Sequence, residues 1–148
     1  MNHAAKLSAL QAELVGFEAL LALLRDENRL LLDGNTAALP EITQKKDALI
    51  NRLDQQAMER AKWLPVESEA RAKLLALHPD IAVLWSNLTD QAKQASTLNQ
   101  LNGKIINQRL QHNREALNIL RGQEGNQNIY GPDGQPLEGA SGRTLGSA

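Results

Sequence analysis

The sequence LNQLNGKIINQRLQHNREALNIL, which runs from Leu98 to Leu120, decides how this chain folds. It belongs to a longer run from Pro79 to Arg121 that has no further proline and keeps its apolar residues at helical spacing. A single helix over this run would be about 65 Å long, from a rise of about 1.5 Å per residue. The spacing therefore predicts one long helix over 79–121, along which the rest of the chain packs.

The apolar face of this long helix changes direction at residues 105 and 106. A first stripe consists of Ile81, Leu84, Leu88, Ala95, Leu98 and Ile105, and a second of Ile106, Leu110, Asn113, Leu117 and Leu120. One residue rotates a helical face by about 100°. A buried amide without a partner is costly, so Asn113 on the second stripe, four residues after Arg109, indicates a hydrogen-bonding contact. Gly103 costs about 1 kcal/mol against alanine, and we expect a close helix approach or a local bend there.

Three further helices are predicted, over about 4–32, 40–64 and 67–77. The first carries a heptad of apolar residues that only Asn28 interrupts: Leu7, Leu10, Leu14, Phe17, Leu21, Leu24 and Leu31. This heptad is typical of coiled-coil packing, in which Asn28 either fixes the register or marks a fraying end. Gly34 suits a left-handed position after the helix. We interpret Lys45 and Lys46 as a solvated edge of the second helix.

The composition changes after Arg121. Seven of the ten glycines and two of the five prolines lie in residues 122–148, with few large apolar residues. Such a segment does not bury enough surface to offset its ordering entropy, so we expect a flexible tail over 122–148.

The fold class predicted from these patterns is all-α. We expect an elongated, antiparallel, up-and-down bundle of three to four long helices with coiled-coil packing, formed by residues 1–121. Residues 67–77 either continue the second helix as a kinked arm or form a separate helix. In the first case the long helix outreaches the helix over 4–32, and roughly residues 109–121 have no partner within the chain.

Composition argues against several classes of function. The chain has no cysteine, a net charge of −1 and no basic cluster, which disfavours thiolate chemistry and nucleic-acid binding. We find no uninterrupted apolar run of membrane-spanning length and no secretory signal. The three histidines have no ligand-spaced partners, and no catalytic constellation is present, so we expect no metal, no cofactor and no enzyme activity. We expect Trp63 and Trp85 to pack within the bundle, and the leucine heptad to pack within its own chain rather than as a dimer seam.

The residues from Asn102 to Leu120 resemble the C-terminal signature of the FlgN-type flagellar export chaperones. The segment Asn102-Gly103-Lys104-Ile105-Ile106 is similar to the family's NG-x-x-I element, and it leads into R-L-x-x-N-x-x-x-L-x-x-L from Arg109 to Leu120. Tyr130-Gly131-Pro132-Asp133-Gly134 is similar to the family's YG-x-x-G element. The resemblance covers nearly the whole chain, although only these two segments are specific.

The resemblance implies a cytoplasmic chaperone of a type III export system. Such a chaperone binds flagellar hook–filament junction proteins, prevents their premature assembly and delivers them to the cytoplasmic domain of the export gate, with no cofactor and no stable membrane insertion. Partner binding would fall on Ile106, Arg109, Leu110, Asn113, Leu117, Leu120, Ile129, Tyr130 and Gly131. The alternatives are a helical coiled-coil adaptor with an unrelated client and a homo-oligomeric scaffold that associates through the seam from Leu7 to Leu31.

Overall fold

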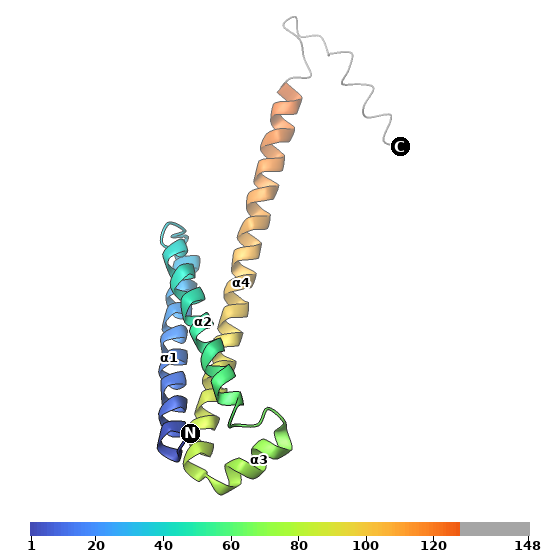
Figure 1. The fold of residues 1–148 in the computed structure, drawn as a ribbon. Helices are drawn as coiled ribbons and strands as arrows, with labels where there is room; N and C mark the ends of the chain where they lie inside the picture. Colours follow the sequence, from blue (N-terminus) through green and yellow to red (C-terminus); the bar gives the residue numbers. More distant parts are fainter. Residues whose placement is uncertain (128–148) are drawn as a thin grey trace, which may run out of the picture. The chain divides into compact units, whose positions relative to one another are not determined.

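The structure is a computed structural model that describes residues 1–127, with side chains to residue 122. Four α-helices follow one another: α1 (His3–Asp33), α2 (Leu39–Ala61), α3 (Ser68–Leu77) and α4 (Pro79–Gln127) (Figure 1). The predicted all-α fold is confirmed. The chain divides into a first unit, Met1–Ile105, and a second unit that begins at Ile106, and α4 contributes to both.

The predicted helix boundaries lie within a few residues of the observed ones, with one larger difference. The segment over 67–77 forms a separate helix, α3, which settles that alternative. Helix α4 continues to Gln127, six residues beyond the predicted end, because Gly122 and Gly125 do not interrupt it. A glycine lowers helix stability without imposing a break, unlike proline.

The ends of α1 are fixed by local hydrogen bonds. The side chain of Asn2 accepts a hydrogen bond from the backbone N–H of Ala5 at 2.8 Å and thereby caps the first turn. Gly34 adopts a left-handed conformation with φ of 73°, as predicted. The N–H of Asn35 then donates to the carbonyl of Leu30 at 3.0 Å and closes the last turn.

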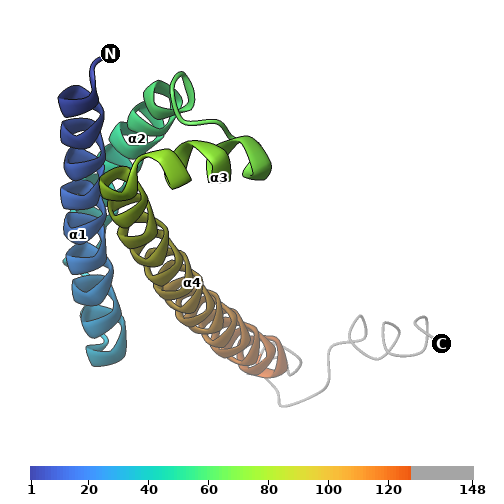
Figure 2. The ribbon, with the colours of Figure 1, turned by 90° about the horizontal axis from the view of Figure 1, so that it is seen from below.

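Helices α1, α2 and the part of α4 in the first unit lie side by side (Figures 1 and 2). Their side chains form two apolar clusters. One cluster contains Leu20, Leu21, Leu24, Leu53 and Ala95, and the other Leu10, Ile81 and Leu88. Within the first unit the chain runs up α1, down α2 and up again along α4 as far as Ile105 (Figure 1). Helix α3 has no buried residue and connects the end of α2 to the start of α4.

Two helical glycines, Gly16 and Gly103, differ in how closely another helix approaches them. A Cβ built on Gly16 of α1 would lie 2.8 Å from Cδ2 of Leu53, so this glycine permits α2 to lie close to α1. A Cβ on Gly103 would meet nothing within 4 Å. Of the two alternatives expected for Gly103, the close helix approach is therefore wrong among the described residues, and the local bend stays a prediction.

Helix α1 differs from the sequence expectation in one respect. Of the helices in residues 1–127, α1 alone is long and apolar enough to cross a membrane by length and composition, with an 18-residue window of mean hydropathy 1.6. The apolar run in α1 is nevertheless interrupted, because charged residues are admitted within this window. Core helices of soluble proteins meet the same criterion, and α1 contributes leucines to both apolar clusters.

Candidate functional site

The C-terminal part of α4, from Gln111 to Gly122, has exposed side chains throughout. It nevertheless carries large apolar residues: Leu117 is 52% exposed, Ile119 63% and Leu120 55%. Leu110, about two turns before Leu117, is 49% exposed. The residues of the second stripe, including Asn113, recur at spacings of three and four and therefore share one helical face. This face is the candidate partner-binding site, because contiguous exposed apolar surface usually marks an interaction site.

The other residues predicted for this site differ in their surroundings. Asn113 is exposed on the same face as Leu110 and Leu117, whereas Ile106 and Arg109 are half-buried. Ile119 is exposed beside the predicted residues, although it falls outside the heptad spacing that selected them. Ile129, Tyr130 and Gly131 lie outside the described residues, as does most of the predicted tail.

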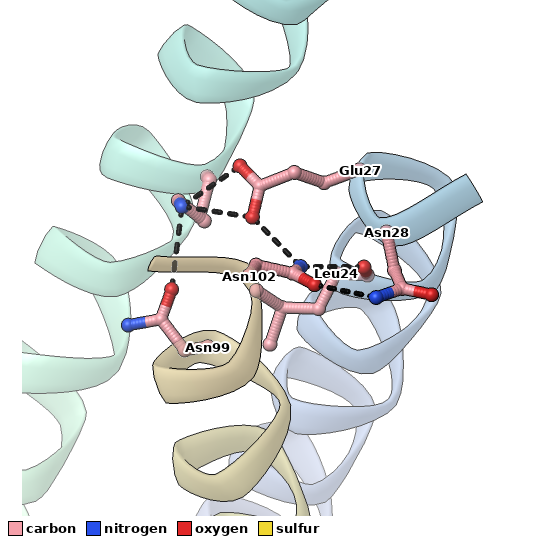
Figure 3. A network of polar contacts seen from close by, with 6 residues as sticks. Leu24, Glu27, Asn28, Asn99 and Asn102 are labelled. Carbon is pink, nitrogen blue, oxygen red and sulfur yellow. Dashed lines mark hydrogen bonds and ion pairs between the residues drawn. The ribbon is translucent and has the colours of Figure 1, made fainter. Parts of the chain in front are cut away.

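A polar network joins α1, α2 and α4 where the packed part of α4 ends (Figure 3). Asn102 is fully buried, and its Nδ2 donates to the carbonyl of Leu24 at 2.9 Å and to Oε1 of Glu27 at 2.8 Å. Its Oδ1 accepts from Nδ2 of Asn28 at 2.9 Å. From α2, the ammonium of Lys46 donates to Glu27 at 2.9 Å and to Oδ1 of Asn99 at 3.3 Å.

This network corrects two sequence interpretations. Lys45 is exposed and pairs with Glu41 on its own helix, as a solvated residue does. The side chain of Lys46, by contrast, is only 14% exposed, because it reaches inward to Glu27. Asn28 is no fraying end, since it is held by Asn102 seventy-four residues away. One feature of the sequence indicates that Asn102 is buried: it lies seven residues after Ala95, which belongs to the first stripe.

A second buried ion pair lies in the first unit. Glu13 of α1, with a side chain 2% exposed, accepts a hydrogen bond from Nη1 of Arg60 on α2. Burial raises the pKa of Glu13 above its ordinary value, and the nearby Arg60 guanidinium opposes that rise. The guanidinium of Arg60 also lies 5.0 Å from the ring centroid of Trp85, which adds a cation–π contact.

Both tryptophans belong to the bundle, as predicted. Trp63 and Trp85 are half-buried and pack against the cluster of Leu10, Ile81 and Leu88. Lys6 lies 5.6 Å from the ring centroid of Trp63, and Arg71 of α3 lies 5.3 Å from that of Trp85. The two rings therefore contact residues of α1, α2 and α3, and Trp85 itself belongs to α4. They are not free anchors for a partner.

The titratable residues of the described chain form no metal-binding group. Within residues 1–127 no three His, Cys, Asp or Glu side chains gather closely enough to hold a metal ion. His3 pairs with Asp80 at 2.6 Å, and this hydrogen bond lowers the pKa of Asp80. The pair links the start of α1 to the start of α4 at the surface.

Comparison with known proteins gives consistent matches along the chain. The family model described as FlgN protein matches residues 1–138. The chain is 29% identical to the flagella synthesis protein FlgN of Proteus mirabilis over 131 residues, which cover 85% of this chain and 86% of that protein. It is 28% identical to the FlgN of a Yersinia enterocolitica strain over 144 residues, which cover 93% of each chain.

A shorter match has slightly higher identity. The chain is 30% identical to the flagella synthesis protein FlgN of Salmonella typhimurium over 101 residues, which cover 68% of this chain and 66% of that protein. No solved structure matches the chain. Because the family model spans nearly the whole sequence, the chain belongs to the FlgN family.

Proposed function

We propose that this protein is a cytoplasmic export chaperone of flagellar assembly that binds hook–filament junction proteins, keeps them from assembling early and delivers them to the export gate. Membership of the FlgN family supports the flagellar role, since the matching relatives are named flagella synthesis proteins. The observation that carries the proposal is the exposed apolar face of α4 at Leu110, Leu117 and Leu120.

The client would be an amphipathic helix. Two helices that present apolar residues at spacings of three and four bury them against each other by coiled-coil packing. Leu110, Leu117 and Leu120 supply the apolar contact with the client, together with the half-buried Ile106. Asn113 lies among these leucines and would hydrogen-bond a polar group of the client, which fixes the register at some cost in affinity.

The tail residues Ile129, Tyr130 and Gly131 complete the proposed binding element. They lie outside the described residues, and the proposal for them rests on the family's YG-x-x-G element. A segment that orders only on binding gives up part of the interaction free energy, which lowers affinity and favours release. A chaperone that must hand its client to an export gate benefits from that property.

The test is affinity between the full chain and the junction proteins of the same organism, measured by calorimetry. Leu117→Asp places a charge on the proposed face, and we expect affinity to fall at least tenfold. Gln108→Asp is the matched control: it is also exposed and lies nine residues away, about 180° around the helix. It adds the same charge on the opposite face and should leave affinity within twofold.

Two outcomes would contradict the proposed site. If Leu117→Asp loses helical circular dichroism, the leucine belongs to a core, and the face is not free for a client. If both aspartate variants bind as the unmodified chain does, the client contacts another surface. Tyr130→Ala tests the tail separately. The rival scaffold predicts stable oligomers without any client, which light scattering on the purified chain would detect.

A further inference from the structure

Helices α1 and α4 are in strict register within the first unit. The buried α4 residues Ile81, Leu88, Ala95 and Asn102 recur every seven residues, and none is more than 3% exposed. Each has an α1 counterpart 74 positions earlier: Leu7, Leu14, Leu21 and Asn28. Leu7 and Leu14 pack in the cluster of Ile81 and Leu88, and Leu21 packs in that of Ala95. The two helices run parallel, and these pairs form successive layers.

The last of these layers is polar. Asn28 and Asn102 meet through a hydrogen bond of 2.9 Å (Figure 3). They occupy the position at which the preceding layers hold apolar side chains. The Nδ2 of Asn102 donates to the carbonyl of Leu24 and to the carboxylate of Glu27, both on α1. Lys46 of α2 neutralises Glu27, so the polar layer is satisfied by groups from all three helices.

A satisfied polar layer stabilises one alignment more than any other. If α4 moved seven residues toward the start of α1, Leu88 and Ala95 would still meet leucines, at Leu7 and Leu14. Ile81 would lose its counterpart on α1, and Asn102 would face Leu21. Its amide would then be buried without its partners, which is unfavourable because the desolvated amide makes no compensating hydrogen bonds. Leucine at position 102 would carry no such penalty. In coiled coils a single buried asparagine sets register and partner choice in this way.

We infer that the Asn28–Asn102 pair is the specificity element that makes α1 accept α4 of its own chain in one register only. The pair excludes slipped alignments and excludes the α4 of a second copy that approaches in another register. Apolar burial by the leucine heptad provides affinity between the helices, and the pair provides selectivity. This role concerns the packed part of the molecule and does not depend on the proposed client binding.

The absence of cysteine in the chain allows a direct test by thiol crosslinking. Arg25 of α1 and Thr97 of α4 line the same groove, so Arg25→Cys with Thr97→Cys reports the observed register through a short bismaleimide. Arg25→Cys with Lys104→Cys reports the alignment shifted by seven residues. When Asn102→Leu is added to each cysteine pair, we expect crosslinking between positions 25 and 104 to rise at least threefold relative to crosslinking between positions 25 and 97. Crosslinks between two copies of the chain should rise by the same factor.

Gln91→Leu is the matched control. It makes the same amide-to-leucine change on α4, but the buried Oε1 of Gln91 has no hydrogen-bond partner. Its crosslinking ratio should stay that of the unmodified chain. If Asn102→Leu fails to fold, Asn28→Leu removes the same hydrogen bond by changing Asn28, which is only half-buried. An unchanged ratio in a helical Asn102→Leu or Asn28→Leu chain would overturn the inference, as would an equal rise in Gln91→Leu.

Discussion

The two parts of α4 have similar sequence patterns and opposite surroundings. From Ile81 to Asn102 every seventh residue is buried by α1 and α2. From Leu110 to Leu120 leucines recur at spacings of seven and three, yet they and every other side chain from Gln111 to Gly122 are exposed. Periodicity thus predicts that a face needs a partner, but it does not say whether the partner belongs to the chain. The first part is core, and the second is the proposed binding surface.

The largest expected effect on stability comes from the polar end of the packed part. Lys46→Ala leaves the carboxylate of Glu27, with a side chain 2% exposed, without its counter-ion. Breaking a buried pair from one side costs about 3–5 kcal/mol, and urea unfolding should detect a loss of this size. Lys45→Ala, on the exposed neighbour, should change the midpoint little. Equal effects of the two variants would mean that Glu27 is solvated.

The two parts of α4 should also differ in their response to the same leucine deletion. Leu88→Ala removes a side chain that is 2% exposed, and core deletions of this type cost about 2–5 kcal/mol. Leu117→Ala removes one that is 52% exposed, and it should leave the unfolding free energy within about 0.5 kcal/mol. Thermal unfolding of both variants measures the contrast. A large loss for Leu117→Ala would end the distinction between core and surface.

Gly16 and Gly103, which both lie inside helices, should respond to alanine in opposite directions. Gly103→Ala gains helix propensity in open space and should stabilise the chain by about 1 kcal/mol. Gly16→Ala brings a methyl group within 2.8 Å of the buried Leu53 side chain. Overpacking of this kind costs about 1–3 kcal/mol, which exceeds the gain in helix propensity. Chemical unfolding of the two variants side by side would show the sign of each change.

The smallest effect expected is a pH dependence from Glu13. Its pKa is raised by burial in the folded state, so the folded chain holds this proton to higher pH than the unfolded chain does. The contribution of Glu13 is therefore complete below its unfolded-state pKa and declines as pH rises through the raised folded-state value. Arg60 limits the size of this decline. The stability of the unmodified chain relative to Glu13→Gln should fall from pH 4 to pH 7, and a rise would contradict the burial argument.

Much of the fold could be predicted because helical periodicity is a local property. The heptad from Leu7 to Leu31 and the left-handed Gly34 each follow from a few neighbouring residues. The exposed face at Leu110, Leu117 and Leu120 could also be proposed, since it continues the same spacing. The burial of Lys46 could not, because a lysine next to another lysine gives no local sign that a carboxylate lies nineteen residues earlier on another helix.

The sequence by itself determined the class of fold, the approximate helices and the family, since these depend on spacing along one helix and on short motifs. Only the tertiary structure decided which polar residues are core. Asn28 and Asn102 are ordinary helix residues until two parallel helices bring them within 2.9 Å of each other. Whether a polar side chain is solvated or buried depends on groups distant in sequence, because a hydrogen bond needs a partner in space and not a neighbour in the chain.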